Sequence, residues 1–398
     1  MSSTSICKGL SQLPWQVGAF CLALLVYGVS GSPTPDEIGV SEVLTCLLLL
    51  ASIRLPDVRR LPAPVIIFAI YGLSIPVLTG VLAGHSMGLI LRDLIAFGFL
   101  LLPVFFASSN FRDHRQLVIF TVVLVGLMFS IRALMSYGPA LFHPASWLGL
   151  PPADLLYLAN SPEVLFSGLM LLGTGGFMIW AGQGMIKGMS LAVLAGLPLI
   201  AMAVMMQRAG LGCVVLAGLI WAALGSWHHP ARMGLTAGLL GLLALPLVSL
   251  GSAITSGLIL KTEMVGFNSR TQEWATVLDL IGQSPWTALT GLGWGASFEN
   301  PAVGNLTVNY THSLVSALLL KAGLAGVLAM LAYLWMLAKQ AVPELWRRPV
   351  LMVALAAPLG IGLVFYASYK SLGFGMLLFV LSLSAPYRKL EKNQVDMP

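Results

Sequence analysis

Charged residues are scarce in this chain. Only 9% of its 398 residues are Asp, Glu, Lys or Arg, whereas 58% are hydrophobic and the mean hydropathy is +0.90. A water-soluble domain does not combine so little charge with so many apolar residues, so we expect a polytopic membrane protein. The formal net charge is +6. Because most cations fall on connections expected in the cytoplasm, this excess predicts no nucleic-acid partner.

Patterns for metal, redox and nucleotide chemistry are also missing. None of the four cysteines lies on an expected external loop, so we expect no disulfide framework. The expected external acids include no Asp-x-Asp pair, and no His or Cys cluster has metal-ligand spacing, so we expect neither a metal nor a cofactor. A nucleophile elbow and a Walker motif are absent too. The pair His228-His229 is interpreted as a cytoplasmic turn rather than a metal site.

Hydrophobic runs predict an all-α protein of about twelve membrane spans, each of roughly twenty residues. The expected centres of these spans are Ala23, Leu47, Tyr71, Gly98, Val125, Leu172, Gly196, Gly218, Leu242, Met330, Leu359 and Phe379. Lys and Arg concentrate on alternate connections, which places both termini in the cytoplasm. Residues 1–251 then hold the first nine spans, 252–311 form a long external loop, and 312–398 hold the last three spans and a short cytoplasmic tail.

The long loop contains its own helical pattern. Ser269 and Gln272 have the spacing of a capping box. The apolar residues that follow at helical spacing are Trp274, Val277, Leu278 and Ile281, and the polar residues expected on the opposite face are Glu273, Thr276 and Asp279. We therefore predict an amphipathic helix on the outer membrane surface. Pro285 and the Gly-rich run 291–295 should end it and form a mobile turn that could close over a site.

Cations at the external face oppose the positive-inside preference, and each needs a reason to lie there. Those near the ends of spans or helices are Arg92, Arg132, Arg208, Arg270 and Lys370. Fixed positive charge at one depth favours an anionic ligand, and phosphate suits Arg because the guanidinium binds two oxygens at once. The alternative is that each side chain reaches lipid headgroups. Lys321 lies deeper in the tenth span, where we expect a structural partnership with a buried acid or carbonyl.

His312 is the candidate general base. It follows the polar loop in the segment Tyr310-Thr311-His312-Ser313, immediately before a long hydrophobic run. If Thr311 caps the following helix, the imidazole lies in the first turn, where the positive helix end favours the neutral form that accepts a proton. The alternative is an ordinary interfacial histidine. Tyr310 and Tyr369 are further candidates for substrate contact.

Three motifs in residues 200–330 resemble the O-antigen ligase family. The first is His312-Ser313-Leu314 followed by Leu319, Gly323 and Gly326; the second is Arg208 after a mid-chain span; the third is Ser269-Arg270 with Trp274, Pro285 and Gly291-x-Gly293. Each motif is loose alone, but their order on one membrane face is fairly specific. The sequence departs from the family pattern at Ser313, where Asn is common, and at Lys321, near where the family often has an acid.

The resemblance implies a metal-independent, GT-C-type membrane glycosyltransferase in the inner membrane of a Gram-negative bacterium. Its donor would be O-antigen polysaccharide on undecaprenyl pyrophosphate, and its acceptor a sugar hydroxyl of the lipid A–core, with both chains approaching through membrane lipid. The loop 252–311 would then be periplasmic. His312 would be the catalytic base and Arg208 and Arg270 the pyrophosphate ligands. No obligate protein partner is inferred.

Other functions share parts of this pattern. An O-antigen polymerase or an O-linked oligosaccharyltransferase would use the same donor chemistry, although polymerases usually have two large external loops and protein-glycosylating relatives larger external portions. A transporter of lipid-linked sugar is less favoured. It predicts internal repeats and charges at the bilayer midplane, whereas here only Lys321 is clearly deep.

Overall fold

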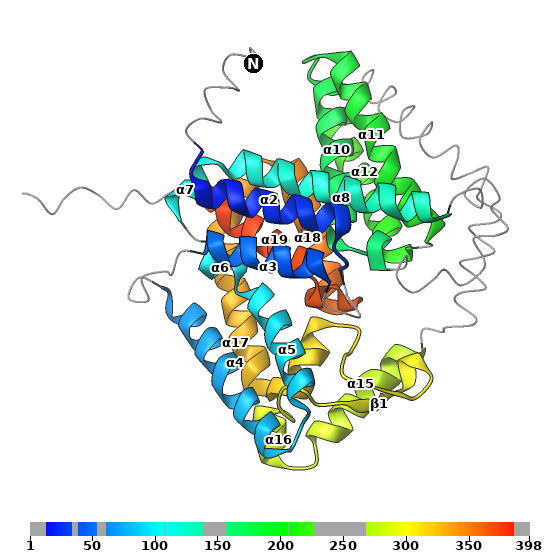
Figure 1. Ribbon diagram of the computed structural model, residues 1–398. Coiled ribbons are helices and arrows are strands. Elements are labelled where there is room, and N and C mark those ends of the chain that lie inside the picture. Colours follow the sequence, from blue (N-terminus) through cyan, green and yellow to red (C-terminus); the bar gives the residue numbers. More distant parts are fainter. Residues whose placement is uncertain are drawn as a thin grey trace, which may run out of the picture.

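The computed structural model describes residues 13–33, 39–53, 61–106, 108–137, 157–205, 207–226 and 268–385. These residues are mostly helical (Figure 1). The elements in chain order are α2 (Trp15–Ser30), α3 (Val40–Ser52), α4 (Ala63–Leu82), α5 (Met87–Leu100), α6 (Leu102–Phe105), α7 (Ser109–Asp113), α8 (Arg115–Tyr137), α10 (Pro162–Trp180), α11 (Met185–Val204), α12 (Arg208–Ser226), α15 (Asn268–Ile281), α16 (Pro285–Thr290), β1 (Phe298–Asn300), η4 (Pro301–Val303), β2 (Leu306–Val308), α17 (Leu314–Leu345), α18 (Pro349–Val364), η5 (Ala367–Lys370) and α19 (Leu372–Leu383).

Hydropathy located the helices well. Every expected span centre except one lies inside a helix, and that one, Leu242, falls outside the described residues. Within the described part of the chain, five helices are long and apolar enough to cross a membrane, namely α4, α8, α10, α11 and α17. The helices α2, α3, α18 and α19 and the first part of α12 are apolar but shorter. The structure therefore has the character of an all-α membrane protein.

Two groups of helices meet at α19. In one group α10 packs against α8, α11 and α18, and α2 against α3 and α8; in the other α17 packs against α4, α16 and α15 (Figure 1). The helix α19 contacts α5, α6, α17 and α18. Its Phe379 joins an edge-to-face cluster with Phe20, Phe106 and Phe111, whose ring centroids lie 4.8–5.5 Å apart. Such clusters bury large apolar area in fixed geometry, and this one ties α2, α6 and α7 to α19.

The helix α17 is broken at Gly323, whose φ of 65° is left-handed. A break frees backbone carbonyls that cannot remain unbonded in an apolar environment. The carbonyls of Leu320 and Lys321 accept from the amides of Leu292 and Gly293 at 2.8 and 2.9 Å, and that of Ala322 accepts from the Tyr71 hydroxyl at 2.7 Å. The carbonyls that the break frees are thus bonded by residues 292–293 and by Tyr71.

Residues 291–295 also bond to a second interrupted helix, which is α4. Pro76 lacks an amide hydrogen, so the carbonyl of Gly72 one turn earlier has no helical donor. The indole Nε1 of Trp294 donates to that carbonyl at 2.7 Å, and the Trp294 backbone amide donates to Pro76 O at 2.8 Å. Residues 291–295 are therefore inserted between α4 and α17. The prediction of a mobile turn here is wrong, because two interrupted helices hold the segment.

Residues 268–311 form a compact unit outside the long helices. The strands β1 and β2 pair antiparallel, a small departure from the all-α prediction. Pro285 opens α16 after the N-cap Ser284 rather than only ending the helix before it. A small core of Val277, Phe298 and Leu320 joins α15, β1 and α17. This core fixes α15 against the start of α17, where His312 lies.

Candidate functional site

His312 lies in the short connection between β2 and α17. The N-cap of α17 is Ser313, whose side chain accepts from the Ser316 amide at 3.1 Å. Thr311 is not the cap. Its hydroxyl donates to the Ser313 carbonyl at 3.0 Å and accepts from the Ser316 hydroxyl at 2.7 Å. The imidazole therefore precedes the helix instead of lying in its first turn, and its position depends on loop contacts.

Glu273 of α15 is the closest charged partner of His312. Its Oε2 lies 2.7 Å from the imidazole Nδ1, and its Oε1 accepts from the His312 backbone amide at 2.9 Å. Asn300 of β1 donates to the same carboxylate at 2.7 Å. Burial would raise the pKa of Glu273, but the hydrogen bonds from His312 and Asn300 outweigh it, and the pKa lies below its ordinary value. The carboxylate is thus held charged against the ring.

This contact corrects one part of the expected orientation of α15. Glu273, expected on the polar face, is only 1% exposed, whereas Val277 and Ile281 of the expected apolar face are buried. The buried face runs through Glu273, Val277 and Ile281, which are four residues apart. The four-residue spacing can be seen in the sequence, but the prediction placed Glu273 on the polar face and so left it out of the buried face. A carboxylate at the head of an apolar stripe was the signal for a buried functional acid.

The carboxylate determines which imidazole nitrogen can act. A proton on Nδ1 hydrogen-bonds to Glu273, which leaves the lone pair on Nε2. The imidazole side chain is 20% exposed, compared with 2% for the Glu273 side chain. The pair can therefore present an oriented, accessible base, in the same arrangement that a buried carboxylate gives to histidine in hydrolase triads.

Two arginines lie on the α15 side of this pair. Arg270 is in the first turn of α15, one turn before Glu273, and α12 begins at Arg208. Partial burial lowers the pKa of the Arg270 guanidinium, the charge of Glu273 opposes this shift, and the positive charge of Arg208 adds to it. Arg208 is thus near enough to act on Arg270. Two adjacent guanidinium groups repel one another and favour an anion between them.

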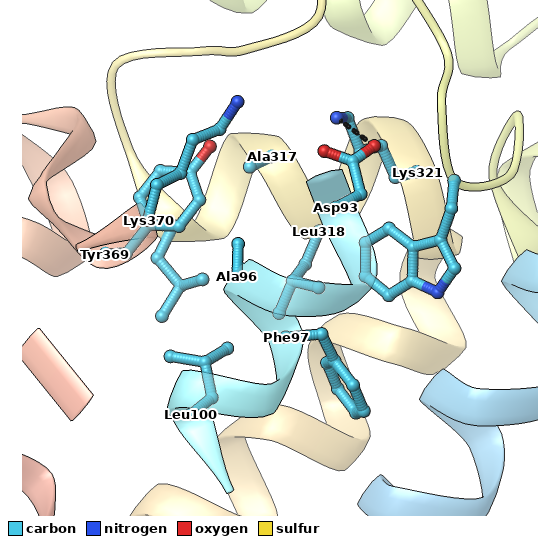
Figure 2. Close-up of a pocket in the computed structure, with 11 residues that line it drawn as sticks. Asp93, Ala96, Phe97, Leu100, Ala317, Leu318, Lys321, Tyr369 and Lys370 are labelled. Carbon is cyan, nitrogen blue, oxygen red and sulfur yellow. Dashed lines mark hydrogen bonds and ion pairs between the residues drawn. The ribbon is translucent and has the colours of Figure 1, made fainter. Parts of the chain in front are cut away.

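A second group of predicted residues lies around Tyr310. The Tyr310 ring meets the imidazole edge-on, with centroids 5.9 Å apart, and the Lys370 ammonium lies 5.2 Å from the Tyr310 centroid. Burial raises the pKa of Tyr310, and the positive charge of Arg92 opposes this shift. Tyr369 is buried beside Lys370 in a pocket between α5 and α17 (Figure 2).

Arg132 does not belong to this site. Its guanidinium donates to the carbonyls of Gly28 and Gly31 at 3.0 and 2.8 Å. These carbonyls end α2, so Arg132 joins α8 to α2 by satisfying groups that the helix leaves unbonded. The sequence places Arg132 near the outer end of a predicted span. That position is compatible both with this structural role and with a supporting role in a site.

Lys321 has the structural partners expected from its depth. Its ammonium contacts Asp93 Oδ2 at 2.5 Å and the carbonyl of Asn309 at 2.6 Å. The same Asp93 oxygen accepts from the Gly295 amide at 2.7 Å. This cluster ties α5, α17 and the inserted segment to the residues just before His312.

No group of three or more His, Cys, Asp or Glu that could hold a metal ion occurs within the described ranges. Comparisons with protein-family models, curated proteins and solved structures find no match to this chain. The chemistry of the site is therefore argued from its residues.

Proposed function

We propose that this protein is a membrane glycosyltransferase that moves a glycan from a polyprenyl pyrophosphate to an acceptor hydroxyl, as O-antigen ligases do. The observation that carries the proposal is the hydrogen bond that Nδ1 of His312 donates to the buried Glu273 carboxylate. It supplies an oriented base, and the neighbouring Arg208 and Arg270 supply positive charge for a leaving pyrophosphate. These are the two requirements of the reaction when the leaving group is already good.

The proposed step is a direct displacement. The acceptor oxygen attacks the anomeric carbon while Nε2 of His312 takes the hydroxyl proton. The bond between that carbon and the phosphate oxygen breaks, and its electron pair leaves with the pyrophosphate. Arg208 and Arg270 bind the charge that develops there, whereas Glu273 stabilises the imidazolium that forms. Attack opposite the leaving group inverts the anomeric centre.

The proposal extends to location and substrates. Donor and acceptor would be undecaprenyl-pyrophosphate-linked O-antigen and lipid A–core at the periplasmic face of a Gram-negative inner membrane, with both termini cytoplasmic. The apolar helices around the site support lateral approach of lipid-linked substrates. A GT-C-like arrangement of about twelve spans belongs to the same proposal. An O-antigen polymerase or oligosaccharyltransferase would share the displacement and differ only in the acceptor.

A reconstituted transfer assay tests this proposal. Purified full-length protein is mixed with lipid-linked glycan and three acceptors, namely lipid A–core, a second glycan and a serine-containing peptide, with a chelator present. Mass analysis identifies the product. We expect covalent transfer to lipid A–core that the chelator does not affect. Transfer only to glycan or peptide would indicate one of the alternatives, and no covalent product with any acceptor would contradict glycosyl transfer.

A further inference from the structure

The pocket between α5 and α17 carries more positive charge than its one acid can neutralise. Asp93 is already engaged by the Lys321 ammonium and the Gly295 amide. Lys370 donates only a long hydrogen bond of 3.3 Å to Asn309 O, a carbonyl that Lys321 already contacts at 2.6 Å. Among the described residues Lys370 forms no ion pair. Its ammonium therefore keeps unused donor capacity.

A buried hydroxyl lies beside this ammonium. Tyr369 is only 5% exposed, and its hydroxyl makes no hydrogen bond with the described part of the chain, although Thr311 is near. Figure 2 shows the Tyr369 hydroxyl and the Lys370 ammonium together on one side of the pocket, with the Asp93–Lys321 pair on the other. A buried hydroxyl without a well-formed hydrogen bond is costly, and a ligand oxygen in the pocket would satisfy it.

The available groups are donors, which identifies the class of ligand. The Lys370 ammonium and the Tyr369 hydroxyl lie together on one side of the pocket. The side-chain amide nitrogen of Asn309 is also buried without a partner among the described residues. The positive charge of Arg92 acts on Lys370. Burial lowers the pKa of Lys370 well below its ordinary value, and the charge of Lys321 adds to this shift. An anionic oxygen would satisfy the donors and stabilise the charged form of the Lys370 amine.

The size and place of the pocket limit how the anion binds. Its volume of about 20 Å³ accommodates roughly one oxygen atom, so a phosphate or carboxylate would insert one oxygen from the open side. Tyr310 contacts both Lys370 of this pocket and the His312 ring. The charges that act on Lys370 are those of Lys321, Asp93 and Arg92, whereas those that act on Arg270 are those of Glu273 and Arg208. The base thus lies near two groups of cations.

We propose that Lys370 and Tyr369 form a second anion site, near the positive charge of Arg92, that binds a phosphate or carboxylate group on the acceptor glycan. The assignment to the acceptor rests on the proposed function, in which the arginine pair binds the donor pyrophosphate. A hydroxyl near that anionic group would then be held beside the imidazole. The site would select acidic acceptor sugars over neutral ones.

Binding of glucose 6-phosphate tests the site without requiring transfer. The full-length protein in phosphatidylcholine nanodiscs is titrated by ligand-observed ³¹P NMR, and uncharged glucose is added as a competitor that should not displace the probe. Lys370→Gln should weaken binding about tenfold, and Tyr369→Phe by a smaller factor, whereas Lys370→Arg should retain it. The matched control is Lys339→Gln, which removes the same charge from an exposed position on α17. The titration is repeated on Arg270→Gln, which removes the other proposed phosphate site, and the dependence of binding on Lys370 should persist there.

Several outcomes would overturn the proposal. They are the absence of glucose 6-phosphate binding, equal binding by the native protein and Lys370→Gln, and complete loss of binding in Arg270→Gln while Lys370 is intact. Displacement of the probe by phosphatidylglycerol nanodiscs would assign the site to lipid headgroups. If Lys370→Gln does not fold, Tyr369→Phe decides. In the transfer assay Lys370→Gln should raise KM for a phosphorylated acceptor and leave KM for the donor unchanged. If the protein binds the probe through Lys370 but transfers no glycan, the anion site stands, and only the glycosyltransferase function and the assignment of the site to the acceptor are refuted.

Discussion

Glu273 holds His312 through two hydrogen bonds, one to the ring and one to the backbone. The bonds measure 2.7 Å from Oε2 to Nδ1 and 2.9 Å from the His312 amide to Oε1. A carboxylate that fixes both the ring and the chain of a histidine determines where the free Nε2 points. The connection before α17 is therefore a rigid part of the site, although it is neither helix nor strand.

Replacing Glu273 with Gln should reduce glycan transfer strongly. The amide cannot stabilise the imidazolium, and it favours the wrong ring tautomer, so we expect kcat to fall about 10²–10⁴-fold. The matched control is Asp279→Asn, which neutralises an exposed acid on the same helix and should retain activity. Equal rates for Glu273→Gln and the native protein would show that the carboxylate has no part in the reaction.

The same carboxylate predicts a dependence of stability on pH. The pKa of Glu273 is lower in the folded protein than its ordinary value of about 4.3, so its charge stabilises the fold above that pH. This contribution is lost as the pH falls through the lowered folded pKa. The thermal midpoint should therefore drop less with acidification in Glu273→Gln than in the native protein. Identical pH profiles would mean that the carboxylate gains nothing on folding.

Arginine should be required at both proposed pyrophosphate positions. Lysine keeps the charge of Arg208 or Arg270 but binds as a single point instead of a fork. We expect each Lys variant to lower kcat/KM about 10–100-fold and each Ala variant to lower it further. Arg347→Lys, at an 82% exposed side chain, is the control. Full activity of both Lys variants would indicate that charge alone suffices.

The hydrogen bond that the Trp294 indole donates to the Gly72 carbonyl should stabilise the folded protein. Trp294→Phe keeps an aromatic ring beside Phe97 but leaves the Gly72 carbonyl without its indole donor. An unsatisfied buried carbonyl costs about 1–3 kcal/mol, which a thermal unfolding midpoint in detergent would detect. Trp286→Phe alters an indole that is 64% exposed and should have little effect. If both variants melt alike, the inserted segment does not depend on this bond.

Much of the helical framework was accessible from hydropathy, because each apolar run must form a helix to satisfy its backbone in a membrane. Local residue chemistry also predicted that Lys321 needs a partner, and it proposed His312 and Arg270 as site residues. These features depend on side-chain type and approximate depth, which a single sequence records directly.

The remaining features depend on contacts between distant segments. Residues 291–295 read as a flexible turn because nothing local shows that Pro76 and Gly323 free carbonyls for them. Glu273 looked like a solvated acid until α15 was placed against His312. Arg132 looked like a ligand residue because its carbonyl partners on α2 are about a hundred residues away.

The most direct test is the single-turnover rate of His312→Ala with purified lipid-linked donor and lipid A–core acceptor. The His114→Ala variant is the matched control, since it removes an imidazole that contacts only the Asn110 carbonyl among the described residues. Loss of the base should reduce transfer by about 10²–10⁴-fold while donor binding persists. Native-like transfer by His312→Ala would contradict the role of the Glu273–His312 pair in catalysis.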